Sequence, residues 1–167
     1  MRVRAERPAD VDTVRKLNRA AFEGSDEARI VDALRGAVSP LVSLVAESHH
    51  AVVGHILFSP VTLASAPDLS LMGLAPMAVL PDHQRQGIGS ALVRAGLGLC
   101  RELGAIGVVV LGHAAYYPRF GFVPASRYGL RCEYDVPDDA FMAVELVEGA
   151  LAGHAGTVRY HAAFAGG

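Results

Sequence analysis

Residues 77–90 read MAVLPDHQRQGIGS and connect an apolar segment to a helical pattern through a short polar turn. The first N–H groups of a helix have no partner inside the helix and lie at the positive end of its dipole, so they can bind an anion. Glycine at positions 87 and 89 lets a phosphate approach the backbone closely, and Arg85 adds a positive charge beside them. This stretch predicts a phosphate-binding loop between a strand and a helix.

Two other phosphate-binding motifs are excluded by the residues in and around this loop. A P-loop requires a lysine directly after its last glycine, and the only lysine of the chain is Lys16. A dinucleotide-binding G-x-G-x-x-G motif requires a third glycine, and this sequence has Leu92 at that position. A G-x-G alone is also found in ordinary tight turns, so its interpretation depends on the rest of the chain.

The segments around the loop have the patterns of a mixed α/β domain. Residues 87–103 repeat apolar side chains at helical spacing, and residues 106–111 form the continuous valine-rich run typical of a strand buried on both faces. The other patterns predict strands over 1–7, 41–47, 51–62, 69–80, 140–147 and 157–164, helices after Pro8 and Ser25, and a short helix over 114–120. This order predicts one α/β domain over residues 1–167.

Composition excludes several classes of protein. Half of the 167 residues are hydrophobic and 19% are charged, which excludes a disordered chain. The net charge is −2 and the 15 basic residues are scattered, so neither nucleic acid nor a membrane is an expected partner. The N-terminus is too charged for a secretory signal, and Cys100 and Cys132 do not have the spacing of a metal site. We expect a cytoplasmic protein without a metal; a monomer and a homodimer both remain open.

Three stretches of the sequence resemble a known family. The QRQGIG of residues 84–89 resembles the Q/R-x-x-G-x-G/A signature of the GNAT superfamily of N-acetyltransferases, and residues 117–122 resemble its Y-x-x-x-G-F element. HILFSPV at 55–61, LAPMAVLP at 74–81 and YYPRFGFVPA at 116–125 further resemble the YhbS-like subgroup of predicted acetyltransferases. The resemblance covers nearly the whole chain.

This resemblance implies a fold and a co-substrate. The expected fold is a mixed, mostly antiparallel sheet, splayed between its fourth and fifth strands and flanked by helices. The expected co-substrate is acetyl-CoA, whose pantetheine arm pairs with a strand and whose pyrophosphate lies on the loop. One departure is Val110, where many members of the family have an asparagine. The implied cofactor-binding residues are Met77, Ala78, Val79, Arg85, Gln86, Gly87, Ile88, Gly89 and Ser90.

The resemblance also implies a catalytic acid. Tyr117 matches the tyrosine that protonates the leaving thiolate in the family, although a tyrosine in this position can also serve only in packing. The attacking amine must be neutral, so a general base is expected. His113 and Glu47 are the two candidates, and the resemblance does not choose between them; a lone histidine in such a domain is more often structural.

The resulting hypothesis is an N-acetyltransferase that transfers an acetyl group from acetyl-CoA to a primary amine by direct attack in a ternary complex. The alternatives are a non-catalytic acyl-CoA-binding or sensing domain and an enzyme that transfers a longer acyl group. Acidic residues between the first two helices either line the acceptor entrance or only stabilise a helix start; they are Glu23, Asp26 and Glu27. A small molecule, a peptide N-terminus and a lysine all remain open as acceptors.

Overall fold

The structure is a computed structural model that describes residues 1–166. Its α-helices are α1 (Val11–Phe22), α2 (Asp26–Leu34) and α3 (Ile88–Glu102). Its strands are β1 (Arg2–Ala5), β2 (Val42–Ser48), β3 (Ala51–Leu63), β4 (Ala66–Val79), β5 (Gly107–Leu111), β6 (Val123–Pro124), β7 (Leu130–Cys132), β8 (Phe141–Glu145) and β9 (Gly156–Arg159). Within residues 1–166, no helix combines the length and the apolar character needed to span a membrane.

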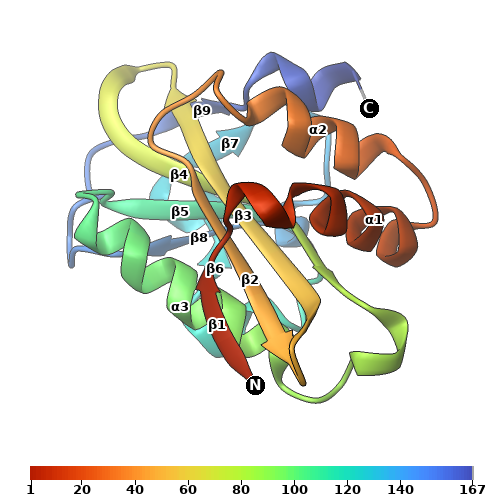
Figure 1. The fold of residues 1–167 in the computed structure, drawn as a ribbon. Coiled ribbons are helices and arrows are strands. Elements are labelled where there is room, and N and C mark those ends of the chain that lie inside the picture. The colour runs from red at the N-terminus through yellow and green to blue at the C-terminus, as the bar shows by residue number, and fades with distance from the viewer. Residues whose placement is uncertain (167) are drawn as a thin grey trace.

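The strands form one sheet in the order β1-β2-β3-β4-β5-β8-β6, and β9 joins the end of β3 and carries β7 beside it (Figure 1). Neighbouring strands are antiparallel except in the β4–β5 and β7–β9 pairs. This is the mixed, mostly antiparallel sheet that the sequence predicts.

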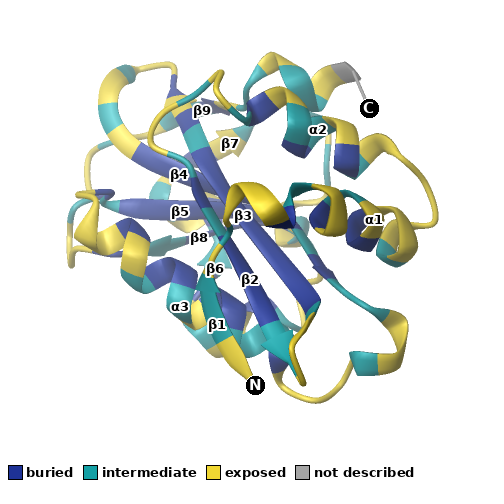
Figure 2. Ribbon diagram, in the orientation of Figure 1, coloured by how far each residue is buried: buried dark blue, intermediate teal, exposed yellow. Residues whose placement is uncertain are grey.

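The two faces of the sheet are covered by different elements. Alternate residues of a strand point to opposite faces, so Leu44 and Ile56 pack toward α3, whereas Val45 and Leu57 pack toward α1 and α2. Helix α3 can approach β3 closely because Gly96 has no side chain. A Cβ at this position would lie only 2.0 Å from the ring of Phe58. The central strands β3 and β5 are accordingly buried over most of their length (Figure 2).

Strand β5 is buried on both faces, as its valine-rich sequence predicts. Val108 and Val110 belong to the core under α3. Val109 faces the opposite side and packs in a second core with residues of β8 and β9, including Ala143 and Val158. Val110, where the family often has asparagine, is therefore a core residue of this chain.

Strands β4 and β5 separate in the middle of the sheet. Their parallel pairing runs from Leu71 with Gly107 to Leu74 with Val110 and then stops, although β4 continues to Val79. Beyond Leu74, β4 has two residues opposite a single residue of β3, which is a β-bulge. The bulge and the lost pairing confirm the predicted splay between the fourth and fifth strands. Among residues 1–166, no strand pairs with the β5-facing edge of β4 beyond Leu74.

Two predicted elements differ from the structure. Residues 114–120 form turns and a single 3₁₀ turn, Tyr117–Phe120, in place of a short α-helix. The strand predicted over 157–164 ends at Arg159, and Ala162–Gly166 is a 3₁₀ helix. Strand β9 pairs with β3 only at Thr62 and Leu63, and with β7 on its other side.

A buried histidine connects α1 to the sheet. His55 is fully buried; its Nδ1 lies 3.3 Å from Nδ2 of Asn18 in α1, and its Nε2 lies 2.9 Å from Oγ of Ser43. The Asn18 amide donates to Nδ1, so the proton of the ring is on Nε2 and the ring is neutral. Burial, with a smaller contribution from the charge of Arg35, lowers the pKa of His55 to about 3.

The neutral His55 makes stability depend on pH. The unfolded chain binds a proton at this ring below about pH 6.5, whereas the folded chain does not bind it until about pH 3. The free energy of unfolding should therefore fall as the pH is lowered through 6.5, with a contribution of up to about 1.4 kcal/mol per pH unit. Urea denaturation between pH 6.5 and pH 5 measures this slope.

The control is His55→Gln, which keeps hydrogen-bonding groups but does not titrate and should flatten the slope. If that variant does not fold, the NMR signals of the His55 ring in the wild-type protein decide the matter. A ring that titrates near pH 6.5 in the folded protein contradicts the prediction.

Candidate active site

The predicted phosphate-binding loop lies between the end of β4 and the start of α3. A 3₁₀ turn, Pro81–His83, follows β4, and two glutamine side chains then fix the loop to the preceding backbone. The Nε2 of Gln84 donates to the carbonyl of Val79 at 3.2 Å, and the Nε2 of Gln86 donates to the carbonyl of Asp82 at 3.4 Å. Such bonds hold the loop in one shape in front of the helix.

Gly87 caps the N-terminus of α3 in a backbone conformation that favours glycine. Its φ is +83°, in the left-handed region, and it is the N-terminal cap of the helix. Arg85 also has a left-handed φ of +63° and is exposed. The N–H groups of the first helical turn are thus presented at the end of the loop, a few residues after Arg85.

A cavity of about 820 Å³ opens in front of this helix start. Seven of the nine predicted cofactor-binding residues line it, namely Met77, Val79, Arg85, Gly87, Ile88, Gly89 and Ser90. The other two do not. Ala78 alternates with Met77 and Val79 along β4 and is buried on the opposite side, with 2% of its surface exposed. The side chain of Gln86 is turned back to Asp82.

Two lining residues that the sequence did not indicate form the opposite wall. The Tyr116 hydroxyl lies 3.3 Å from Oγ of Ser90. The guanidinium of Arg119 stacks over the Tyr116 ring at 4.4 Å from its centre, and its Nε donates to the Tyr116 carbonyl at 2.8 Å. A Cβ at Gly89 would lie 3.0 Å from the Tyr116 hydroxyl. Glycine at 89 therefore gives this wall its close approach to the helix start. The remaining lining residues missed by the sequence are His83, Gln84 and Ala115.

A second cavity, of about 480 Å³, lies where β4 and β5 separate. Helices α1 and α2 contribute Phe22 and Glu27, and the bulged part of β4 contributes Leu74–Met77. The end of β5 and the segment after it contribute Leu111, Gly112, His113, Tyr116 and Tyr117. Met77, His113 and Tyr116 line both cavities. The two cavities therefore adjoin at these residues, and we call the pair the cleft; its first part lies at the start of α3 and its second part reaches Glu27 of α2.

Tyr117 lines the second cavity and not the first. Its ring packs edge-on against Tyr116 and Phe122, with ring centres 5.2 and 5.6 Å apart, and only 7% of the residue is exposed. Burial raises the pKa of Tyr117 to about 12. The phenol thus keeps its proton at neutral pH. The second of the predicted catalytic residues, His113, is exposed in the loop after β5 and borders both parts of the cleft.

Glu47, the third predicted catalytic residue, is held elsewhere. Its carboxylate accepts a hydrogen bond from Nε of Arg4 at 3.0 Å, and this pairing lowers the pKa of Glu47. Arg4 also binds Asp10 at 2.7 Å, so Glu47 belongs to a network that joins β1 to β2. It lines neither cavity, and the structure does not bring it together with Tyr117 and His113.

The three acidic residues Glu23, Asp26 and Glu27 differ in their surroundings in the structure. Glu27 lines the second cavity, whereas Asp26 forms an ion pair with Arg29 one turn along α2. Glu23 is exposed at the end of α1 and lines neither cavity. The acceptor-entrance interpretation therefore concerns Glu27 alone. Asp26 is the first residue of α2 and fits the helix-start interpretation, whereas Glu23 caps the C-terminal end of α1 and fits neither.

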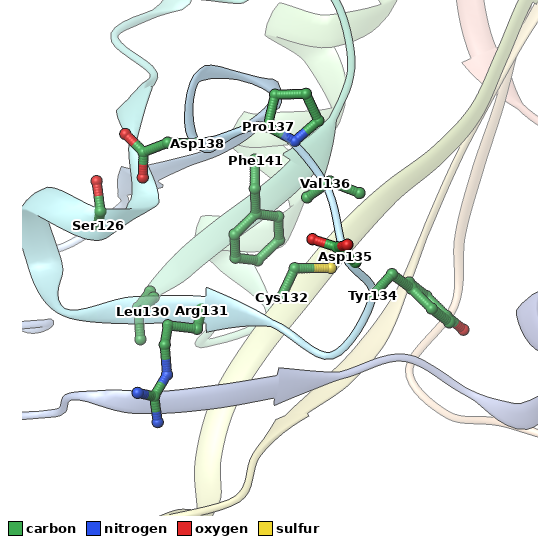
Figure 3. A pocket seen from close by; sticks show the side chains of 10 residues that line it. All are labelled: Ser126, Leu130, Arg131, Cys132, Tyr134, Asp135, Val136, Pro137, Asp138 and Phe141. Atoms are coloured by element: carbon green, nitrogen blue, oxygen red, sulfur yellow. The ribbon is translucent and has the colours of Figure 1, made fainter.

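A separate cavity of about 270 Å³ lies between the Ser126–Leu130 region, β7 and the start of β8, and shares no lining residue with the cleft (Figure 3). The Cys132 side chain points into it between Phe141 and Asp135. Burial raises the pKa of Cys132 and raises that of Cys100, in the core, to about 12. Within residues 1–166, no group of three or more His, Cys, Asp or Glu side chains could hold a metal ion.

Comparisons with known proteins agree with this geometry. A family model described as an acetyltransferase (GNAT) domain matches residues 40–124. The uncharacterized N-acetyltransferase YhbS of Escherichia coli K12 is 38% identical over 165 residues, which are 98% of each chain.

Two solved structures are similar over the same length. The structure of E. coli YhbS in complex with CoA has a TM-score of 0.92 at 37% identity, with 98% of this chain and 91% of that chain covered. A GNAT family acetyltransferase from Brucella melitensis in complex with acetyl-CoA has a TM-score of 0.81 at 39% identity, with 98% and 97% covered. This chain therefore belongs to the GNAT family of acetyltransferases, which confirms the family and the enzyme class, an acyltransferase, that the sequence predicts.

Proposed function

We propose that this protein transfers an acetyl group from acetyl-CoA to a primary amine by direct attack of the amine within the cleft. The observation that carries the proposal is that the two cavities adjoin: the helix start with Gly87 and Gly89 lines the first, and Tyr117 lines the second. Met77, His113 and Tyr116 line the junction. A donor bound at the helix start and an acceptor bound beyond the splay would meet there.

The first part of the cleft fits the shape and charge of acetyl-CoA. The pyrophosphate would lie on the free N–H groups of α3 beside Arg85. The pantetheine arm would lie along Met77–Val79, whose edge has no partner strand after the splay, and would pair with it as an added strand does. The wall formed by Tyr116 and Arg119 would close the other side. The complexes of the two similar structures with CoA and acetyl-CoA support this assignment.

The chemical step needs one base and one acid. His113 takes a proton from the incoming ammonium, so that the nitrogen carries a free electron pair. The nitrogen attacks the thioester carbonyl carbon; the C–N bond forms, the C–S bond breaks, and Tyr117 gives its proton to the leaving sulfur. The nitrogen then loses its second proton through water, which restores the Tyr117 phenol. The net products are an N-acetyl amide, CoA with a free thiol, and one proton.

The state of the cysteines supports direct transfer. A cysteine that accepts an acyl group must react as a thiolate. Burial raises the pKa of both Cys100 and Cys132, and neither residue lines the cleft. A covalent acyl-cysteine therefore has no support in this chain.

Substitution of Gly89 tests the donor half of the proposal. In Gly89→Val the side chain would displace the Tyr116 hydroxyl from the helix start and occupy the space proposed for the pyrophosphate. We expect the affinity for acetyl-CoA to fall by at least roughly tenfold, about 1.4 kcal/mol, as measured by calorimetry.

The matched control is Gly98→Val in the same helix, where an added Cβ meets no atom within 4 Å. It makes the same residue change within the same helix but should bind acetyl-CoA as the wild type does. Wild-type affinity in a folded Gly89→Val protein would remove the helix start from the binding site.

A further inference from the structure

We infer that the acceptor is a primary amine on an apolar body that carries no carboxylate, and that Glu27 selects it. This inference rests on the proposed function and concerns the second part of the cleft, beyond the junction. Its support comes from two independent features of that cavity: the apolar side chains that it exposes and the sign of the charge in its wall.

The first feature is exposed apolar surface. Phe22, at the end of α1, is 40% exposed, and Leu111, at the end of β5, is 36% exposed. Both line the second cavity, from opposite sides of the splay. Large apolar side chains that gather in one hollow are a mark of a ligand site. Met77, which is partly exposed, continues this apolar surface to the junction, so an apolar body would cover it.

The second feature is charge. Glu27 is the one carboxylate among the residues that line this cavity, and its lining includes neither lysine nor arginine. An acceptor with a carboxylate next to its amine, such as a free amino acid, would find no lysine or arginine in this lining to pair with and would be repelled by Glu27. A carboxylate that leaves water without a partner is strongly disfavoured. A cationic amine without that group would be attracted.

We assign Glu27 a different role from that of the two residues proposed to transfer protons. Glu27 comes from α2, whereas His113 and Tyr117 come from the segment after β5. Glu27 is thus a positioning and selecting residue that acts on acceptor binding, and the proton transfers belong to His113 and Tyr117. Loss of the Glu27 charge should change the KM for the acceptor and leave kcat nearly unchanged.

The experiment compares matched amines by the rate of CoA release. Phenethylamine and phenylalanine differ by one carboxylate, and so do 1,5-diaminopentane and lysine. In each pair we expect kcat/KM to be at least tenfold higher for the member without the carboxylate. Hexylamine and 2-(2-aminoethoxy)ethanol have equal numbers of heavy atoms, and the apolar hexylamine should be the better acceptor.

The variant Glu27→Gln keeps the size of the side chain and removes its charge. Within each carboxylate pair, it should reduce the ratio of the two kcat/KM values by several-fold, through a change in the KM for the amine. Glu102→Gln, an exposed position at the end of α3, removes the same charge and should leave the ratios unchanged. Thermal melts of both variants show whether they are folded.

Equal rates within the pairs, a preference for the amino acids, or unchanged ratios in a folded Glu27→Gln protein would each overturn the inference. The proposed function survives those results as long as some amine releases CoA. Absence of CoA release with every amine, in a protein that binds acetyl-CoA, overturns the function and the inference together.

Discussion

Replacing Tyr117 with phenylalanine should lower turnover by about 10²- to 10⁴-fold, which corresponds to roughly 3–5 kcal/mol of activation barrier. Phenylalanine keeps the ring that packs against Tyr116 and Phe122 and removes only the hydroxyl. The affinity for acetyl-CoA should be nearly unchanged, because Tyr117 lines the second part of the cleft and not the first. Single-turnover kinetics with calorimetry separate the two effects.

The pKa of Tyr117 gives this prediction a pH signature. Because burial raises that pKa to about 12, the phenol should act as a proton donor over the whole range in which the enzyme is folded, with no loss of activity near pH 10. Acyl donors whose leaving thiol is more acidic should lose less rate in Tyr117→Phe, since their sulfur needs the proton less. Wild-type turnover with chemistry rate-limiting would make Tyr117 a packing residue.

Replacing His113 with alanine should also lower turnover strongly, by about 10²-fold or more, at neutral pH. The loss should shrink as the pH rises, because the amine then loses its proton to the solvent without help. His113 is exposed, so the substitution should not change stability. The rate of Tyr117→Phe should show no such recovery, which distinguishes the base from the acid in the same assay.

Glu47 provides the control for this assignment. Glu47→Gln should lower stability modestly by weakening the network with Arg4 and Asp10 and should leave turnover unchanged. A pH-dependent loss of turnover in Glu47→Gln, together with normal turnover in His113→Ala, would reverse the choice of base.

The sequence predicts those elements whose pattern is long and regular. Helix α3 and strand β5 are found where the helical spacing of 87–103 and the valine run of 106–111 place them. Strands β6 and β7 are two and three residues long, too short for any period to appear. Strand β9 pairs with the end of β3 and with β7, and no local pattern in residues 157–164 shows where those pairings stop.

The candidate site follows the same division. The glycines and the neighbouring residues of the loop are a local motif, and seven of the nine predicted residues line the first cavity. Tyr116 and Arg119 lie in an irregular turn, where the direction of a side chain is not set by a period of two or of 3.6 residues. Glu27 reaches the cleft because α1 and α2 pack beside the splay, which is a tertiary arrangement. The choice of Tyr117 rather than Tyr116 as the proposed acid rests on the resemblance to the family.

The most direct test follows the acetyl group itself. Purified protein is mixed with acetyl-CoA, first alone and then with a mixture of primary amines, while free thiol is measured and both the protein and the amines are weighed by mass spectrometry. We predict thiol release only when amines are present, one N-acetylated amine per thiol, and no acetylated protein. Tight binding of acetyl-CoA without release in either mixture would contradict the account and identify a binding or sensing domain.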